Sequence, residues 1–313
     1  MNDISAFADS GQTWERLLRR VGAQHWPAST LYVVATPIGN LGDLTLRAWQ
    51  ALARCDVIAA EDTRSSRTLL DAWGVDTPLM AAHQHNEAQA AQAIVARLAQ
   101  GERVALVSDA GAPAVSDPGG RIVREVLAAG YGVVALPGAS AVIAALMASG
   151  VTTDENPAFI FAGFMPPKAA ARQKWLAHWC AQTAPVVMFE SPHRLAAAVG
   201  DLLQVCGPER RLTFARELTK RYEQVHTLTL GEASEWLAQD AHRAQGEFVL
   251  IVHQAAAQAQ AAGSASVSID VLLDALLETM SVRDAARVAA RATGLPRDEL
   301  YAAALSRKQA AAS

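Results

Sequence analysis

Four short apolar segments in the first half of the chain each end in a loop of small, proline and acidic residues. The segments with their loops read LYVVATPIGNLGD, DVIAAEDTR, RVALVSDAGAPAVSDPGG and GVVALPGASA, and residues with helical spacing follow each loop. Strands that alternate with helices in this way form a parallel sheet, because each right-handed helical crossover returns the chain to the end of the sheet where the previous strand began. The sequence therefore predicts an α/β fold for this half.

The second half contains further predicted strands, PVVMFES, RLTFAREL, EQVHTLTL and GEFVLIVH, and the last two suit a mixed sheet because turn signals flank both. A length of 313 residues favours about two domains. The sequence predicts five parts, which are a mobile extension with a short helix at 1–30, a first α/β domain at 31–150, a second at 151–253, a linker at 254–266 and a small helical domain at 267–313.

Composition places the chain among compact proteins, since 51% of its residues are hydrophobic and 19% are charged. The longest apolar run, 133–148, is interrupted by Pro137 and Gly138 and is shorter than the roughly 20 residues that span a membrane. The start of the chain carries Asp3 and Asp9 and lacks the features of a secretory signal, so a cytoplasmic location is expected.

No metal site or disulfide is expected. The three cysteines are scattered without a CxxC pair, at Cys55, Cys180 and Cys206. His83 and His85 alternate as on a strand, with Glu87 after them, but a further ligand at a supported spacing is missing.

The net charge of −4 argues against a general attraction to nucleic acid, so any contact with RNA must be local. Basic residues gather at 168–174 and at 210–221, where a solvated surface is the favoured explanation because charge runs are usually solvated. Near the C-terminus, Arg283, Arg287 and Arg291 share one helix face at i, i+4 and i+8. A basic appendage of the helix-turn-helix kind and a solvated bundle face both fit this stripe.

The four strand-end loops of the first half predict a ligand site, because ligands bind at the carboxyl ends of parallel strands. The loop residues expected to approach one another are Gly39, Asp43, Glu61, Asp62, Asp109, Gly111 and Ser140. The loops lack a GxGxxG spacing and a P-loop lysine, and their carboxylates would repel a polyphosphate. A zwitterionic or cationic small molecule fits better, although any one loop also fits a tight turn.

Seven motifs in order carry a family resemblance: TPIGNLGD, AEDTR, SDAGAPAVSDPG, PGASA, ESPHR, ARELTK and GEFVLIV. Residues 31–253 resemble in register the ribosomal RNA small subunit methyltransferase I family, and residues 282–305 resemble its small C-terminal helical domain. The resemblance implies two α/β domains of the tetrapyrrole methylase fold with a small C-terminal helical domain. It also implies a homodimer that binds S-adenosylmethionine between the α/β domains.

The activity implied by the resemblance is methylation of the ribose 2′-oxygen of a decoding-centre cytidine in 16S rRNA, on the small ribosomal subunit. Neither a membrane nor DNA is an expected partner. The resemblance assigns the cofactor to Pro37, Gly39, Asn40, Asp109, Ala112, Ser140 and Ala141, and in the second half to Met188, Ala215, Gly246 and Glu247. Ala112 stands where relatives often have threonine, so a hydroxyl contact is absent there and a backbone contact remains.

Methyl transfer to a ribose hydroxyl requires alignment, together with a group that accepts the proton. The candidate acceptors are Glu61, Asp62, Glu190 and Glu217. The candidate RNA contacts are Arg64, Arg194, Lys220, Arg283, Arg287 and Arg291. Each acid fits an ion pair equally well, such as one between Glu61 and Arg64.

Two alternatives remain open at this point. A methyltransferase of a small molecule such as a tetrapyrrole would share the fold, although AEDTR, ESPHR and the basic C-terminal helices favour RNA. A non-catalytic RNA-binding assembly factor would use the arginine stripe, but aromatic residues that could stack on bases make up only 6% of the chain.

Overall fold

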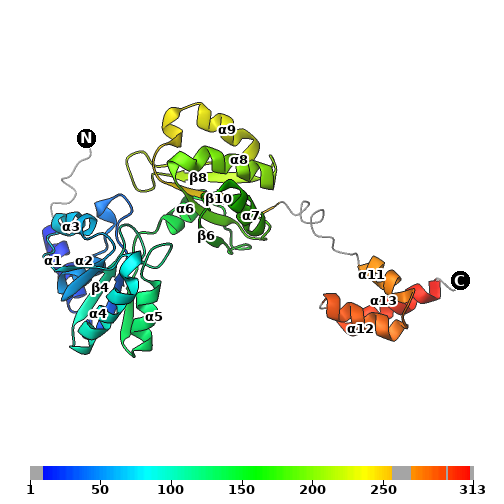
Figure 1. Ribbon diagram of the computed structural model, residues 1–313, viewed down its shortest axis with the longest axis horizontal. Helices are drawn as coiled ribbons and strands as arrows, with labels where there is room; N and C mark the ends of the chain where they lie inside the picture. The colour runs from blue at the N-terminus through cyan, green and yellow to red at the C-terminus, as the bar shows by residue number, and fades with distance from the viewer. Residues whose placement is uncertain (1–9, 256–268, 294, 311–313) are drawn as a thin grey trace. The chain divides into compact units, whose positions relative to one another are not determined.

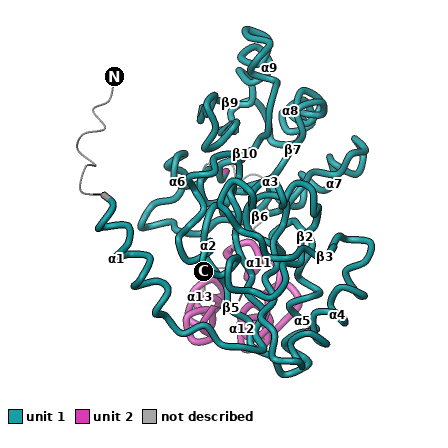
Figure 2. The backbone as a smooth tube through the Cα atoms, turned by 90° about the vertical axis from the view of Figure 1, so that its left-hand side faces the viewer, with its two compact units in different colours: residues 1–254 teal, residues 255–313 magenta. Residues whose placement is uncertain are grey.

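A computed structural model describes residues 10–255, 269–293 and 295–310. The chain divides into two compact units, Met1–Gln254 and Ala255–Ser313, which are described separately (Figure 2). The predicted linker at 254–266 lies outside the described residues except for its first two positions.

The first sheet of unit 1 is parallel throughout, as the strand and helix alternation predicted. Its strand order is β3-β2-β4-β1-β5, and every neighbouring pair is parallel. The strands are β1 (Thr30–Val34), β2 (Val57–Ala60), β3 (Leu79–Ala81), β4 (Arg103–Val107) and β5 (Gly132–Leu136).

Helices cover both faces of this sheet (Figure 1). They are α2 (Leu46–Arg54), α3 (Thr63–Ala72), α4 (Glu87–Ala99) and α5 (Gly120–Ala128). Ile58 of β2 packs in one core with Leu52 of α2, whereas the next residue, Ala59, packs in another core with Ile94 of α4. Burial on both faces explains why these strands are continuous apolar runs.

The second sheet is mixed, with the order β6-β7-β10-β8-β9. The pair β6 and β7 is parallel and the remaining pairs are antiparallel. Its strands are β6 (Ile160–Phe164), β7 (Val186–Glu190), β8 (Arg211–Arg216), β9 (Gln224–Thr229) and β10 (Phe248–Val252). Strand β6 was not among the predicted strands, because a bulge between Phe161 and Gly163 interrupts its pattern and prolines surround it.

One helix connects the two sheets. Helix α6 (Ala141–Ser149) follows β5 of the first sheet, but its residues Val142, Ala145 and Leu146 are buried in one core with Val187 and Val249 of the second sheet. The opposite face of the second sheet packs against α7 (Ala169–Trp179), α8 (Leu195–Cys206) and α9 (Leu230–Ala238). The start of α6 therefore lies where the two halves meet.

The sequence suggested that Arg172 of α7 belongs to a basic surface at 168–174. The structure contradicts this, because the Arg172 side chain is buried. Its Nε donates to Asp201 Oδ2 at 2.7 Å, and Gln173 Nε2 donates to the other oxygen of Asp201 at 2.7 Å. The arginine therefore joins α7 to α8 inside the fold.

The described part of the predicted N-terminal extension is attached to the first sheet. Helix α1 (Ser10–Gly22) precedes β1, and its last residue accepts a hydrogen bond from Arg54 Nη2 at 3.1 Å. The ring centroids of Trp26 and Tyr32 lie 5.8 Å apart, and the Tyr32 hydroxyl donates to the Pro27 carbonyl at 2.8 Å.

The described part of unit 2 contains α11 (Ile269–Leu277), α12 (Val282–Thr293) and α13 (Arg297–Ala310). Its small core is built from Leu273, Ala286, Ala289, Leu300 and Ala304. Arg283, Arg287 and Arg291 are exposed on α12, and Arg287 pairs with Asp284 at 2.8 Å. Across the described parts of both units, no helix has the length and apolar character needed to cross a membrane.

The free energy of unfolding is expected to decrease as the pH falls from about 6.5 towards 4. Burial, with a smaller effect of Arg211, lowers the pKa of His253 to about 4. Thr213 Oγ1 lies 2.8 Å from Nε2 of this histidine and also bonds Thr227. Between the two pKa values the unfolded chain binds a proton that the folded chain does not, so acid favours unfolding.

Denaturant unfolding at pH 7.0 and pH 4.5 tests this expectation. His253→Gln should lose less stability between the two pH values than the wild type, whereas His242→Gln, at an exposed position, should behave like the wild type. An equal loss in all three proteins would show that His253 is not responsible.

Candidate functional site

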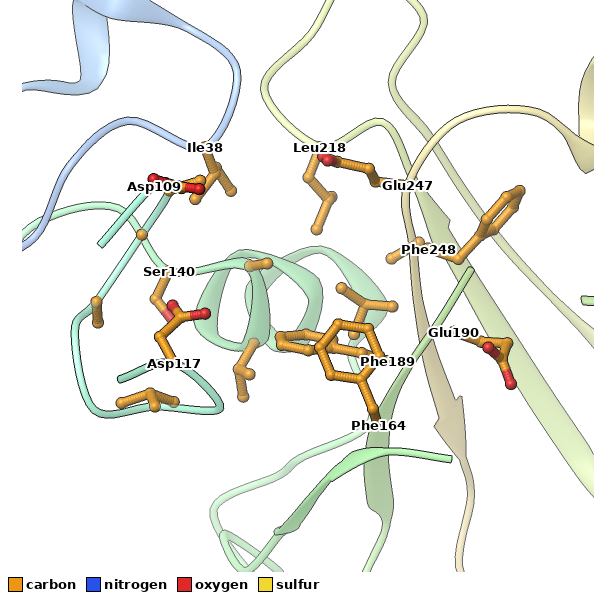
Figure 3. A pocket seen from close by; sticks show the side chains of 18 of the residues that line it. Ile38, Asp109, Asp117, Ser140, Phe164, Phe189, Glu190, Leu218, Glu247 and Phe248 are labelled. Atoms are coloured by element: carbon orange, nitrogen blue, oxygen red, sulfur yellow. The ribbon is translucent and has the colours of Figure 1, made fainter. Parts of the chain in front are cut away.

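A cavity of about 450 Å³ lies where the strand-end loops of the first sheet face the strand ends of the second. This volume is within the usual range for small-molecule sites. Figure 3 shows the labelled residues of the first half on one side, Ile38, Asp109, Asp117 and Ser140, and those of the second half on the other, Phe164, Phe189, Glu190, Leu218, Glu247 and Phe248.

The loops after β1 and β4 are fixed to each other at the cavity wall. Thr36 and Gly111 form an isolated antiparallel bridge, with N–H to carbonyl distances of 2.9 and 3.0 Å in the two directions. Gly111 has a φ of +81°, and a Cβ there would lie 3.2 Å from a methyl group of Ile38. Glycine therefore allows this close approach of two loops.

Of the seven loop residues that were expected to approach one another, only some line the cavity. Glu61, Asp109, Gly111 and Ser140 line the one cavity. Asp62 is not part of the lining, but its backbone N–H donates to Asp109 Oδ1 at 3.0 Å. The two remaining residues of the expected set, Gly39 and Asp43, are also outside the lining.

Negative charge dominates the cavity. The described residues that line it include no lysine, arginine or histidine, and they include five carboxylates, which are Glu61, Asp109, Asp117, Glu190 and Glu247. Burial, followed by the charges of Asp109 and Asp117, raises the pKa of Glu61. Burial also raises the pKa of Asp117, against the effect of a hydrogen bond with Ser108. A cation would relieve this repulsion, so the site favours a positively charged ligand.

Glu190, at the end of β7, is buried and only partly satisfied. Its Oε1 lies 2.5 Å from Arg194 Nη2 and accepts the Ser191 backbone N–H at 2.7 Å. Its Oε2 has no hydrogen-bond partner among the described residues. A buried oxygen of this kind is an unused acceptor at the cavity wall.

Lys220 is held by two acids beside the loop after β1. Its Nζ donates to Glu217 Oε1 at 3.0 Å and to Glu247 Oε2 at 2.8 Å. Although burial acts in the opposite direction, the Glu247 N–H and the lysine lower the pKa of Glu217. A Cβ at Gly39 would lie 2.5 Å from Lys220 Cγ, so the lysine stem packs directly on this loop of the other half.

About half of the residues assigned to the cofactor line the cavity: Asp109, Ala112, Ser140, Ala141, Ala215 and Glu247. The others do not: Pro37, Gly39, Asn40, Met188 and Gly246. Met188 is fully buried in the core on the far face of the second sheet, and Asn40 caps the short 3₁₀ turn Leu41–Asp43 by accepting the Gly42 N–H at 3.0 Å.

The four candidate proton acceptors differ in their surroundings. Glu61 and Glu190 line the cavity, whereas Glu217 is committed to Lys220. Asp62 caps α3, and its pKa is lowered because it accepts the Arg64 backbone N–H at 2.8 Å. Arg64 pairs with Asp62 at 3.5 Å rather than with Glu61, and its side chain is 92% exposed.

Several lining residues were not predicted, among them Asp117 and the aromatic pair Phe164 and Phe189. The two rings meet edge to face with centroids 5.2 Å apart, and they give the cavity an apolar wall. Asp117 lies in the same loop as Asp109, and both aromatics stand at the ends of β6 and β7. Asp117 and Phe189 were identifiable from the sequence, because they lie in a quoted strand-end loop and at the end of the predicted strand PVVMFES, whereas Phe164 ends β6, which the sequence did not predict.

Comparisons with known proteins agree with this architecture. Residues 30–234 match the family model of Tetrapyrrole (Corrin/Porphyrin) Methylases, and residues 263–308 match the RsmI C-terminal HTH domain. The solved structure of uroporphyrin-III C-methyl transferase from Thermus thermophilus, complexed with S-adenosyl homocysteine, is similar with a TM-score of 0.51 and 18% identity, covering 72% of this chain and 97% of that one. This similarity shows the fold.

Curated relatives are closer in sequence. A protein named ribosomal RNA small subunit methyltransferase I from Neisseria meningitidis serogroup B is 49% identical over 226 residues, which cover 72% of this chain and 76% of the relative. The protein of that name from Pseudomonas aeruginosa is 46% identical and covers 72% of this chain and 79% of its own length. The chain therefore belongs to the ribosomal RNA small subunit methyltransferase I family.

Proposed function

We propose that this protein transfers a methyl group from S-adenosylmethionine to the ribose 2′-oxygen of a decoding-centre cytidine in 16S rRNA. The names of the curated relatives support an rRNA methyltransferase of the small subunit. The observation that carries the chemistry is the cavity at the strand ends, with five carboxylates and no basic side chain in its described lining.

The residues present fit S-adenosylmethionine, whose sulfonium and ammonium groups are both cationic. Asp109 and Asp117 offer carboxylates to these charges, and Ala112, Ser140 and Ala215 are small enough to let a ligand approach the backbone. When it is bound, this cofactor supplies an activated methyl group. Bound anions such as a triphosphate would instead meet uncompensated negative charge.

Glu61 is the acceptor that the surroundings favour for the ribose 2′-hydroxyl proton. It lines the cavity, it has no ion pair among the described residues, and its raised pKa lies closer to neutrality than that of an ordinary glutamate. Proton transfer is most efficient when the pKa of the base lies near the operating pH. Glu190 and Glu217 are already paired with Arg194 and Lys220, so we assign these two pairs to positioning.

RNA contacts in this proposal come from exposed arginines. Arg64 stands on the first turn of α3, beside the capping residue Asp62, and its exposed guanidinium can meet a phosphate. Arg283, Arg287 and Arg291 present a second exposed basic surface on α12. A homodimer, the assembled small subunit as substrate and a cytoplasmic location belong to the same proposal, and they rest on the family resemblance.

Methyl transfer from labelled S-adenosylmethionine to small subunits from cells that lack this protein tests the proposal. Nuclease mapping should place the label on the 2′-oxygen of a decoding-centre cytidine. The affinity for the cofactor is measured separately by calorimetry. Cofactor binding without methyl transfer to subunits or to free rRNA would overturn the proposed substrate. Methyl transfer to a tetrapyrrole would then support the small-molecule alternative.

A further inference from the structure

A second hollow lies at the opposite edge of the first sheet. It has a volume of about 350 Å³, and its lining residues are Gln24, His25, Trp26, Arg54 and Arg103. Arg103 is the first residue of β4, and the segment 24–26 precedes β1. The hollow is therefore at the amino ends of the strands, and a five-residue strand of about 17 Å separates it from the cofactor cavity.

Two guanidinium groups are held at this hollow by neutral acceptors. Arg54 donates to the Gly22 carbonyl at 3.1 Å and to Gln50 Oε1 at 2.9 Å, and Arg103 Nε donates to the Trp26 carbonyl at 3.1 Å. Neither arginine takes part in an ion pair with another described residue. These contacts place both side chains at the hollow without a carboxylate partner, and the Arg54 guanidinium also lies over the Trp26 ring, 5.8 Å from its centroid.

Asp56, the acid whose side chain contacts the Arg103 backbone, forms no ion pair with either guanidinium among the described residues. Asp56 uses its Oδ2 to accept the backbone N–H of Arg103 at 2.7 Å. Each guanidinium has five N–H donors, and the contacts above use only a part of them. Arginines held in place with unused donors are suited to phosphate, which they bind through paired hydrogen bonds.

The helix that leads into the hollow is itself basic. Between residues 10 and 29 the chain carries Arg16, Arg19 and Arg20 but only one acid, Glu15. Arg19 and Glu15 lie 3.9 Å apart with both side chains more than 70% exposed, so their interaction is weak. These residues precede position 30, where the match to the methylase family model begins.

We infer that this hollow binds a backbone phosphate of the RNA substrate, with Arg54 and Arg103 as its donors. The inference rests on the proposed rRNA substrate. RNA is the source of phosphate that the surroundings favour, because an extended polyanion can contact the arginines of α1 and the hollow together, whereas a free anion needs only the hollow. Since the site is a strand's length from the cofactor cavity, it adds to RNA affinity and leaves the chemical step unchanged.

Gln24→Glu tests the inference without removing a described side-chain contact, because the hydrogen bond described for Gln24 comes from its backbone N–H. The carboxylate should repel the phosphate and raise the Kd for small subunits about tenfold. The Kd for S-adenosylmethionine and kcat at saturating subunits should stay at wild-type values. Gln92→Glu, the same change at an exposed position of α4, is the matched control and should bind subunits normally.

A second variant, Arg54→Gln with Arg103→Gln, should make log Kd for subunits less dependent on log salt, with the slope reduced by about 1 for each phosphate that the variant no longer binds. Wild-type affinity and salt dependence in both variants would overturn the inference. A second outcome would also overturn the inference. If the wild type binds inorganic pyrophosphate and Gln24→Glu abolishes this binding without changing the affinity for subunits, the hollow is a site for a free anion. If the wild type itself fails to methylate subunits, the proposed function is at fault rather than this site.

Discussion

Replacing Glu61 by glutamine is expected to lower kcat for methyl transfer by about 10²–10⁴-fold, the usual contribution of a general base. The change preserves the shape of the side chain and removes its ability to accept a proton. In the wild type, kcat should increase with pH through the raised pKa of Glu61, because only the ionised carboxylate accepts the proton. This increase should be absent from the variant.

Single-turnover transfer at saturating cofactor and RNA measures the effect, and calorimetry with S-adenosylmethionine shows whether binding has changed. Glu102→Gln is the control, because Glu102 pairs with Arg97 at 2.9 Å and is not part of the cavity. A wild-type kcat in Glu61→Gln would remove this residue as the base. A lower affinity for the cofactor together with a wild-type rate at saturation would assign Glu61 to binding.

The largest effect on stability is expected from Asp201→Ala, which should lower the free energy of unfolding by about 3–5 kcal/mol. Arg172 and Asp201 form an ion pair between α7 and α8, and their side chains are 5% and 12% exposed. Removing the carboxylate leaves a buried guanidinium without its charged partner. Urea unfolding followed by circular dichroism measures the loss.

An exposed pair provides the comparison. Arg121 and Glu125 lie 2.8 Å apart on α5 with side chains 51% and 34% exposed, so Glu125→Ala should cost about 0–1 kcal/mol. Replacing both buried partners, with Arg172→Met and Asp201→Leu, should recover much of the stability lost in Asp201→Ala. Equal losses from Asp201→Ala and Glu125→Ala would show that burial does not set the cost.

Four of the five strands of the first sheet were predictable because each is an uninterrupted apolar run that ends in a distinctive loop, whereas the three-residue β3 was not predicted. Strand β6 was not, because the bulge at Gly163 breaks the alternation on which strand assignment depends. The burial of Arg172 could not be predicted either, since it depends on Asp201, a residue of the next helix. Local patterns identify elements, but they do not identify partners that are brought together by packing.

The candidate site shows the same limit at the scale of single residues. The sequence identified the loops that form the cavity, but neighbouring residues in one loop have different roles. Glu61 faces the cavity, whereas Asp62 turns back to cap α3. In the same way, in the loop after β1, Ile38 lines the site whereas Asn40 caps a short turn. The direction of a side chain in an irregular loop depends on backbone angles that composition does not encode.

Helix α6 has a consequence for how such a chain can be divided or recombined. The predicted boundary near residue 150 falls just after this helix, but the core partners of Val142, Ala145 and Leu146 belong to the second half. A fragment cut at that boundary would expose these apolar side chains to water and would leave Val187 and Val249 uncovered. The two halves are therefore not interchangeable modules, and a chimera that exchanges one of them must carry both matching surfaces.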